Sequence, residues 1–237
     1  MIKIQIFCLT YAGGNATFFK CLEKYLPQEF EVIAIEYAGH GNRRKEEEYI
    51  SFDDMVEDIQ KIIKLKRNHT IPYSVLGYSM GSLVAFEVLK NRCEEKPLCF
   101  FLAAHEPPHC KSEIQKNGIS NDKELKDRII GLGGIPSQLI SNKRFWDIYM
   151  PIFKKDYNLL HRYEFKESVM LDINSIIFYS EEDTPFSKMS EWQWYFKPQC
   201  EFCKCPGNHF FFNSSIKLIA NKIIEKISEN GMGGYTQ

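Results

Sequence analysis

The sequence has almost no net charge, no long apolar run and no cysteine framework, and each absence excludes a class of protein. Its 30 lysines and arginines are balanced by 31 aspartates and glutamates, so a net charge of −1 provides no basic field for nucleic acid. No apolar run approaches the roughly 20 residues that a membrane-spanning helix needs. The N-terminal run MIKIQIFCLT lacks the long apolar core and small-residue cleavage site of a signal peptide, and we expect none. We therefore expect neither a nucleic-acid partner nor a membrane.

The eight cysteines do not show the regular spacing of a disulfide-bonded domain. Cys8, Cys21, Cys93, Cys99 and Cys110 are scattered, and without a signal peptide they are predicted to be reduced thiols in the cytoplasm. Hydrophobic residues make up 44% of the 237 residues, which is enough to bury one sizeable core. We expect a monomer whose residues 1–237 form a single domain.

The stretch VLGYSMGSLVAF, residues 75–86, is the strongest indication of function. An apolar strand runs into a G-x-S-x-G turn and then into an apolar helix, which is the order of a nucleophile elbow that exposes one serine in a cleft. Gly77 and Gly81 fit this interpretation because strand and helix would pass too closely for larger side chains. The turn places Ser79 at a helix N-terminus, where the N–H of Met80 would point at a developing oxyanion. The same pentapeptide also occurs in Gly/Ser turns that carry no chemistry.

Strands and helices alternate along most of the chain. Near-continuous apolar runs predict buried strands, and apolar residues at helical spacing predict the helices between them. This alternation predicts an α/β fold with a mostly parallel sheet and helices on both faces. Besides the elbow, the expected strands cover residues 2–9, 31–37, 97–104, 175–180 and 200–205, and the expected helices cover residues 17–25, 52–65 and 214–227.

Residues 111 to about 165 interrupt the alternation. A polar start, the glycine-rich run GLGGIP and then aromatic residues at helical spacing predict a helical lid inserted over the cleft. Gly133 and Gly134 are the expected flex points of this lid. Its apolar side chains would either line a channel for an acyl chain or only hold the lid in place. The glycine-rich tail over residues 230–237 is predicted to be disordered.

Among the six histidines, His209 is the best candidate for a general base. It follows the last expected strand on a Pro-Gly turn, and the chain order Ser79, Asp183, His209 is the serine–acid–histidine order of α/β-hydrolases. Glu106 follows the strand after the elbow helix and is an alternative acid, although Pro107-Pro108 would hold its backbone extended. We predict that a carboxylate oxygen of Asp183 lies within hydrogen-bond distance of His209 Nδ1.

Other polar residues admit an ordinary structural interpretation beside the functional one. The loop at residues 10–16 contains a glycine pair, and the N–H near Ala12 is expected to be the second oxyanion donor, although a plain strand-to-helix turn is equally consistent. His40 lies in a Gly-rich turn and is expected to be a hydrogen-bonded loop residue. The run Arg43-Arg44-Lys45 could meet an anionic substrate, but neighbouring glutamates indicate a solvated loop.

A cysteine-rich run, Cys200-x-x-Cys203-x-Cys205, lies close to His209 in sequence. Thiolate and imidazole would suit zinc. In a strand, however, Cys203 and Cys205 share one face and Cys200 lies on the other. We therefore expect no metal site.

Taken together, these segments resemble type II thioesterases, the free-standing editing enzymes of nonribosomal peptide and polyketide synthases. The chain is also similar to the medium-chain acyl carrier thioesterase of fatty acid synthesis. Tyr78 stands where the family usually has a histidine in the elbow, a position outside the triad. The matching segments run in order along nearly the whole chain: Tyr11–Gly14 (YAGG), Gly77–Gly81 (GYSMG) with Ala85–Glu87, Leu132–Pro136 (LGGIP), Pro151–Tyr157 (PIFKKDY), Asp183 and Gly207–Phe211 (GNHFF).

The resemblance implies an α/β-hydrolase fold and acyl transfer to water. Ser79 would be the nucleophile, His209 the base and Asp183 the orienting acid, with the N–H groups of Met80 and Ala12 as the oxyanion hole. The substrate would be an acyl group on the phosphopantetheine arm of a carrier protein, which makes the carrier the expected partner and requires no metal or redox cofactor. The side chains expected to contact substrate are Tyr11, Tyr78, Leu132, Ile135, Phe153 and Phe210.

Three other functions could use the same residues. A carboxylester hydrolase or lipase has the same triad, and an acyltransferase replaces water by an amine or an alcohol. A catalytically inactive α/β-hydrolase could serve as a binding module, although the presence of all three triad residues argues against it.

Overall fold

The computed structural model describes residues 3–90, 95–111, 116–166 and 169–231. Residues 232–237 of the predicted disordered tail lie outside these ranges. The first residues of that predicted tail instead end the last helix, α10 (Ile216–Gly231), in which Asn230 Nδ2 donates to the carbonyl of Lys226 at 2.8 Å. Within the described ranges, no helix is both long enough and apolar enough to cross a membrane.

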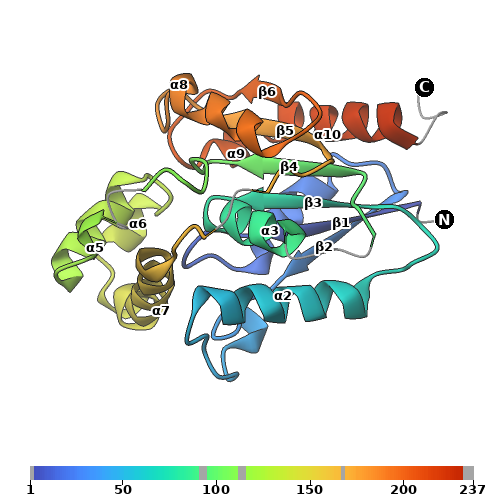
Figure 1. The fold of residues 1–237 in the computed structure, drawn as a ribbon. Helices are drawn as coiled ribbons and strands as arrows, with labels where there is room; N and C mark the ends of the chain where they lie inside the picture. Colours follow the sequence, from blue (N-terminus) through green and yellow to red (C-terminus); the bar gives the residue numbers. More distant parts are fainter. Residues whose placement is uncertain (1–2, 91–94, 112–115, 167–168, 232–237) are drawn as a thin grey trace.

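The described strands form one parallel sheet, as the sequence predicts (Figure 1). Their order is β2-β1-β3-β4-β5-β6, so the chain moves from β1 to one side and then returns to the other. A reversal of this kind opens a crevice at the carboxyl ends of the two strands between which it occurs, here β1 and β3. The strands are β1 (Ile4–Leu9), β2 (Phe30–Ile35), β3 (Tyr73–Tyr78), β4 (Cys99–Ala103), β5 (Asn174–Tyr179) and β6 (Glu201–Lys204).

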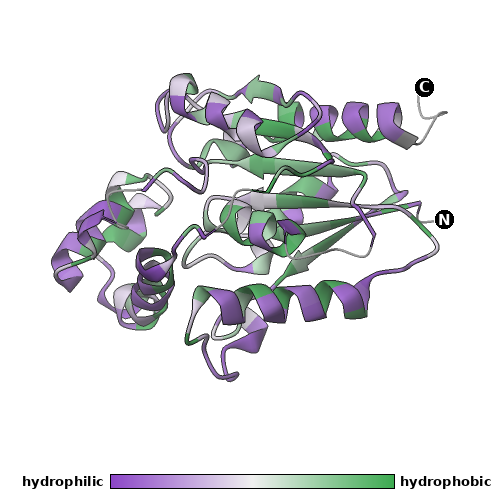
Figure 2. Cartoon of the chain, in the orientation of Figure 1, coloured by the Kyte–Doolittle hydropathy of each residue, from purple (hydrophilic) through white to green (hydrophobic). Residues whose placement is uncertain are grey.

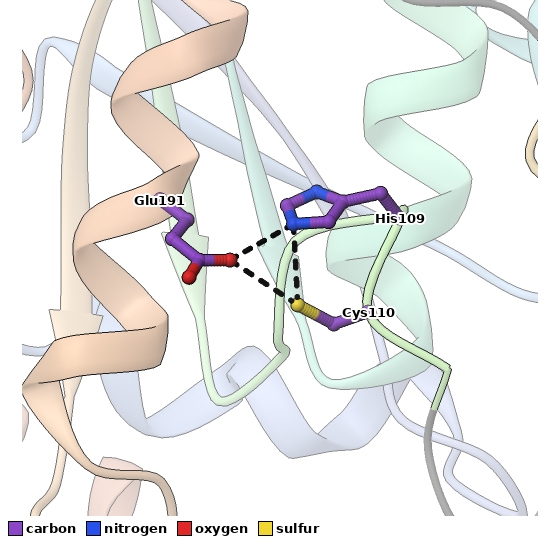
Figure 3. A group of neighbouring side chains, drawn as sticks. All are labelled: His109, Cys110 and Glu191. Atoms are coloured by element: carbon purple, nitrogen blue, oxygen red, sulfur yellow. Dashed lines mark hydrogen bonds and ion pairs between the residues drawn. The ribbon is translucent and has the colours of Figure 1, made fainter.

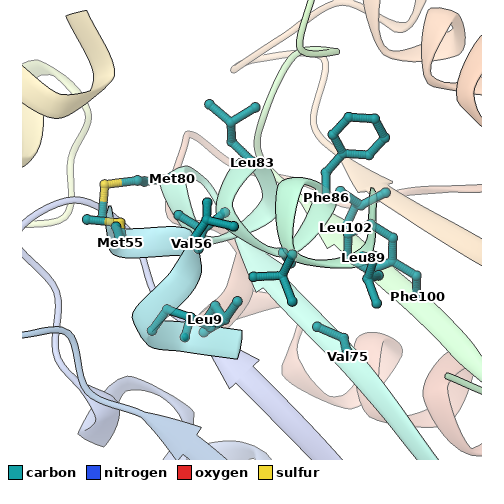
Figure 4. Close-up of a cluster of buried hydrophobic side chains, with 14 of the residues drawn as sticks. Leu9, Met55, Val56, Val75, Met80, Leu83, Phe86, Leu89, Phe100 and Leu102 are labelled. Carbon is teal, nitrogen blue, oxygen red and sulfur yellow. The ribbon is translucent and has the colours of Figure 1, made fainter. Parts of the chain in front are cut away.

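Alternate side chains of the strands enter two separate cores, because successive residues of a strand point to opposite faces of the sheet. On one face, α2 (Phe52–Lys66) and α3 (Met80–Lys90) cover the sheet (Figure 4). On the other, α10 and the short α1 (Lys20–Glu23) cover it. The strands are largely hydrophobic, whereas α2 and the helices beyond the sheet carry many hydrophilic residues (Figure 2).

Local sequence explains where α2 begins. Ser51 Oγ accepts from the N–H of Asp54 at 3.1 Å, and the Asp54 carboxylate accepts from the N–H of Ser51 at 3.0 Å, which completes a capping box. One stripe of the helix is buried, as its apolar spacing predicts, and consists of Phe52, Met55, Val56, Ile59 and Ile63.

The predicted helix over residues 17–25 is shorter and tighter than expected. Asn15 accepts from the N–H of Thr17 at 3.0 Å and starts a 3₁₀ turn, η1 (Ala16–Phe19), which runs directly into α1. The buried Phe19 and Leu22 still face the sheet, so the apolar pattern was interpreted correctly although the helix type was not.

In the predicted insertion between β4 and β5, the longer described helices lie beyond the sheet (Figure 1). These are α5 (Asp122–Gly131), α6 (Ser137–Ile140) and α7 (Lys143–Arg162). Asn121 and Asn142 cap α5 and α7, each accepting a backbone N–H at 3.0 Å. Further short elements are η2 (Gly41–Arg43), α8 (Phe186–Met189), η3 (Ser190–Tyr195) and α9 (Phe211–Ser214).

Candidate active site

Ser79 lies in the sharp turn between β3 and α3 with a φ of +53°, a conformation that side-chain-bearing residues rarely adopt. Its own N–H donates to the carbonyl of Ala103 on β4 at 2.8 Å, which fixes the turn against the sheet. The flanking glycines are sterically required. A Cβ on Gly77 would lie 2.5 Å from Ser82 Cα, and a Cβ on Gly81 would overlap the carbonyl of Leu9.

The predicted triad residues meet in the structure. His209 Nε2 lies 2.9 Å from Ser79 Oγ, and His209 Nδ1 lies 2.9 Å from Asp183 Oδ1. The predicted hydrogen bond between Asp183 and His209 is therefore present. Glu106, the alternative acid, instead accepts from Lys188 Nζ at 2.8 Å.

The loops that carry Asp183 and His209 are tied to each other. Ser180, at the end of β5, accepts from the N–H of Asp183 at 3.1 Å and donates from its hydroxyl to the carbonyl of Gly207. The Glu182 carboxylate accepts from the N–H of Gly207 at 3.2 Å. The carboxylate of Glu182 is therefore bonded to Gly207 and not to His209. Together these bonds hold the loop of Asp183 at a fixed distance from the loop of His209.

Tyr78 does not contact the cleft, and its prediction as a substrate-binding residue was wrong. Because it precedes Ser79 on β3, its side chain points to the opposite face of the sheet, where it is fully buried. Its hydroxyl donates to the carbonyl of His209 at 2.6 Å. Tyr78 therefore holds the backbone of the histidine loop from behind.

A cavity of about 500 Å³ opens in front of Ser79 and His209, a size typical of small-molecule sites. Its floor is the carboxyl edge of the sheet, and its far wall comes from the inserted helices. The other predicted substrate-binding residues line it, namely Tyr11, Leu132, Ile135, Phe153 and Phe210. Ala12 and Met80 line it as well, and neither of their backbone N–H groups donates to an acceptor among the described residues.

The inserted helix α7 is joined to the loop after β1 by contacts that sequence reasoning missed. Asp156 Oδ2 accepts from the N–H of Gly13 at 2.5 Å and lies 2.9 Å from His40 Nε2. Gly13 has a φ of +78°, and a Cβ there would overlap the ring of Phe153. The only signal in the sequence was the PIFKKDY segment, which contains both Phe153 and Asp156.

His40 is a buried, hydrogen-bonded loop residue, as predicted. Burial lowers the pKa of His40, but the hydrogen bond and charge of Asp156 outweigh it, with help from the Ala38 carbonyl and Glu36, so the net shift is upward. Of the run predicted to be a solvated loop, Arg44 and Lys45 are exposed, whereas Arg43 is only 19% exposed and ends η2. Arg43 pairs with Glu46 and Asp58.

His105 is a second histidine on the cavity wall that the sequence analysis did not single out. Its Nδ1 lies 2.5 Å from the carbonyl oxygen of Glu106, which can only accept, so this nitrogen carries a proton. Burial lowers the pKa of His105, partly offset by that carbonyl, which favours the neutral ring beside His209.

The three cysteines near His209 are divided between the two cores. Cys200 joins the core under α2 and α3, whereas Cys203 and Cys205 join the core under α10. This is the division that strand alternation predicts.

Nearly the whole chain is similar to known thioesterases. The chain matches the family model of the thioesterase domain over residues 4–229. It is 26% identical over 218 residues to the gramicidin S biosynthesis protein GrsT of Aneurinibacillus migulanus, covering 90% of this chain and 84% of that protein. It is 25% identical over 244 residues to the medium-chain S-acyl fatty acid synthase thioesterase of Homo sapiens, covering 98% of this chain and 90% of that protein.

Among solved structures, ClbQ from the colibactin NRPS/PKS pathway has a TM-score of 0.87 at 23% identity, covering 98% of this chain and 100% of that chain. The structure of RedJ, a thioesterase from the prodiginine pathway of Streptomyces coelicolor, has a TM-score of 0.84 at 24% identity, covering 95% of this chain and 86% of that chain. At these identities the likeness shows that the fold is shared.

Proposed function

The chain belongs to the thioesterase domain family, whose members are hydrolases that act on thioesters, and we propose that its substrate is an acyl or aminoacyl group on the phosphopantetheine arm of a carrier protein. The observation that carries this proposal is the line of contacts from Ser79 through His209 to Asp183, with 2.9 Å at each step, at the floor of a cavity of about 500 Å³. Nucleophile and base within hydrogen-bond distance, with a third group orienting the base, are the arrangement of a serine hydrolase and support this proposal.

The proposed reaction has two acyl-transfer steps. His209 Nε2 takes the proton of Ser79 Oγ, and the alkoxide attacks the thioester carbonyl carbon. The carbon–sulfur bond breaks, and His209 returns the proton to the departing thiolate. In the second step, His209 removes a proton from water, which attacks the acyl-serine ester and releases the acid and the Ser79 hydroxyl. Asp183 keeps the imidazole in the tautomer that accepts at Nε2.

Two backbone N–H groups would stabilise the tetrahedral oxyanion in each step. Met80 supplies one from the N-terminus of α3, and Ala12 supplies the other from the loop after β1. Both residues line the cavity beside Ser79. Each donor of this kind lowers the barrier by about 3 kcal/mol.

The cavity wall suits an acyl chain and a phosphorylated arm. The inserted helices contribute apolar and aromatic side chains that would accommodate the acyl chain, including Ile129, Phe145, Tyr149, Phe153 and Leu160. Basic side chains also line the cavity and would attract the phosphodiester of the arm, namely Lys111, Lys116, Arg128 and Lys188. The arm itself is part of the substrate, so the proposal requires no resident cofactor.

Relatives of this chain suggest where the reaction takes place. GrsT is named for gramicidin S biosynthesis, and ClbQ comes from a pathway of nonribosomal peptide and polyketide synthases. By analogy, we assign this enzyme the clearance or regeneration of carrier proteins in a pathway of that kind. We expect it to act in the cytoplasm as a monomer that visits carrier domains in turn.

A matched pair of substrates tests the proposal. One acyl group is presented as a thioester on a phosphopantetheinylated carrier protein and as a p-nitrophenyl ester, and kcat/KM is compared. A higher value on the carrier supports the proposal, whereas efficient hydrolysis of the ester with none on the carrier identifies a carboxylester hydrolase. Mass spectrometry of the products with added amines and alcohols separates hydrolysis from acyl transfer. A serine-reactive phosphonate that fails to label Ser79 would indicate an inactive binding module.

A further inference from the structure

His109, Cys110 and Glu191 form a compact group of donor atoms (Figure 3), and Cys110 also lines the cavity in front of Ser79. His109 and Cys110 lie in the loop that follows β4, and Glu191 lies in η3. Among the residues that the structure describes, this is the only group of three or more histidine, cysteine or acidic ligand atoms gathered within 4.8 Å of one another. None of the three has a role in the proposed hydrolysis.

We propose that these three side chains form a binding site for a divalent transition-metal ion, Zn²⁺ above all. Each contributes one donor atom, and imidazole nitrogen, thiolate sulfur and carboxylate oxygen are the ligands that zinc takes in proteins. Magnesium and calcium require oxygen donors and would not select a thiolate and an imidazole.

The distances between the donors match a tetrahedral ion. Ordinary zinc–ligand bond lengths at tetrahedral angles place sulfur about 3.5 Å from the nitrogen and from the oxygen, and nitrogen about 3.3 Å from oxygen. In the structure, Cys110 Sγ lies 3.5 Å from His109 Nε2 and 3.6 Å from Glu191 Oε2. Only the distance between His109 Nε2 and Glu191 Oε2, which is 2.8 Å, must open by about 0.5 Å when an ion replaces the hydrogen bond.

The imidazole of His109 is already held in the orientation that a ligand needs. Its Nδ1 lies 2.6 Å from the hydroxyl of Tyr195, which can accept a hydrogen bond from the N–H at that position and leave Nε2 to the ion. The ring is stacked on Trp194, with centroids 5.0 Å apart, and on Tyr195, with centroids 5.8 Å apart. The hydrogen bond of a zinc-bound histidine to a second acceptor is a regular feature of such sites.

Three protein ligands leave the fourth position of a tetrahedral ion open. Cys110 lines the same cavity as Ser79, so the ion would lie at the cavity wall. It would also tie the loop after β4 to η3. Binding should therefore stabilise the folded chain whether or not the protein is turning over substrate.

The test uses the full chain, reduced and freed of metal, titrated with Co²⁺ as a spectroscopic substitute for Zn²⁺. One equivalent should produce a thiolate-to-cobalt charge-transfer band in the near ultraviolet together with the intense visible bands of tetrahedral cobalt. Zn²⁺ should abolish these bands by displacement and should raise Tm, whereas Mg²⁺ should do neither. The absence of a stoichiometric charge-transfer band, or an equal rise in Tm with Mg²⁺, would overturn the proposal.

Variants assign the site. Cys110→Ser should remove the charge-transfer band, and His109→Gln and Glu191→Gln should each weaken Co²⁺ binding at least tenfold. Cys21→Ser, which changes another half-buried thiol, is the matched control and should leave the titration unchanged. Glu191→Gln keeps the shape of the side chain, so it remains informative if another variant fails to fold. If the band survives in Cys110→Ser and disappears in Cys203→Ser, the metal binds at the cysteines near His209 instead. That result would refute the assignment.

Discussion

His40 Nε2 lies 2.9 Å from Asp156 Oδ2, and this buried pair links the turn after β2 to the inserted helix α7. His40 Nδ1 lies 3.0 Å from the carbonyl oxygen of Ala38, which can only accept. Both ring nitrogens therefore face acceptors, and the doubly protonated imidazolium satisfies both. These two acceptors are the main reason that the pKa of His40 is raised.

The pair predicts a specific dependence of stability on pH. A histidine whose pKa is raised on folding contributes stability that is complete below its unfolded value, about 6.5, and is lost as pH rises through the folded value. The parent protein should therefore have a higher free energy of unfolding than His40→Gln, and this difference should be largest at acid pH. It should become smaller toward pH 9. Urea denaturation of both proteins across this range measures it. The groups facing His40 are Asp156 on α7 and Glu36 after β2, and a difference independent of pH would show that the pKa of His40 does not change on folding.

Ser79→Ala should abolish turnover without unfolding the protein. Nucleophile and base act as a unit, so kcat should fall by about 10⁴-fold or more. Ser79→Gly provides a control that is matched to the strained backbone. Because φ at this position is +53°, the glycine variant should be equally inactive and at least as stable as the alanine variant. Thioesterase activity within tenfold of the parent in either variant would remove Ser79 from the mechanism.

Asp183→Asn and Glu106→Gln compare the two candidate acids. An amide in place of Asp183 leaves the histidine in the wrong tautomer, and kcat should fall on the order of 10⁴-fold. Glu106 pairs with Lys188 at the surface of the cavity, and its replacement should cost less than about tenfold. Single-turnover measurements with one acyl-carrier substrate provide both values. Equal losses would assign a direct role to Glu106.

The inserted helices should determine which acyl groups are accepted. Ile135 lines the cavity, and Ile135→Ala should change the ratio of kcat/KM between long acyl groups and acetyl by about tenfold. Ile148 is 54% exposed on α7, and Ile148→Ala is the control that should leave the ratio unchanged. Phe153 is less suitable, since its ring also packs against Gly13. If Ile135→Ala affects every chain length equally, this residue only holds the insertion together.

The features that the sequence predicted correctly are those with a local steric or periodic cause. The elbow depends on glycines two residues before and after Ser79, and the apolar stripe of α2 repeats at helical spacing. Both patterns can therefore be recognised within a short stretch of sequence. The contact of Gly13 with Asp156 joins residues 143 positions apart and has no local pattern, which is why it was missed. Tyr78 was expected to contact substrate, but strand alternation turns its side chain into the core under α10.

The role of Tyr78 leads to a comparison within a single strand. Its hydroxyl donates to the carbonyl of His209 at 2.6 Å, at the carboxyl end of β3. At the other end of the same strand, Tyr73 donates to the carbonyl of Glu95 at 2.7 Å. Both rings are almost completely buried, and each substitution removes a hydroxyl that donates to a backbone carbonyl, which should cost about 1 kcal/mol of stability. The Tyr78 hydroxyl also accepts a longer hydrogen bond from the N–H of Phe212, at 3.4 Å.

Only the bond of Tyr78 leads to the catalytic histidine, so only Tyr78→Phe should impair catalysis. The histidine loop would lose its rear support, and the distance from His209 Nε2 to Ser79 Oγ would no longer be held at 2.9 Å. Because near-attack geometry is sensitive to small displacements, kcat should fall roughly tenfold while KM stays unchanged. Tyr73→Phe should be equally destabilised and fully active. Equal kcat values in the two variants would mean that Tyr78 contributes to stability alone and that Asp183 and the bonds around Gly207 suffice to position the base.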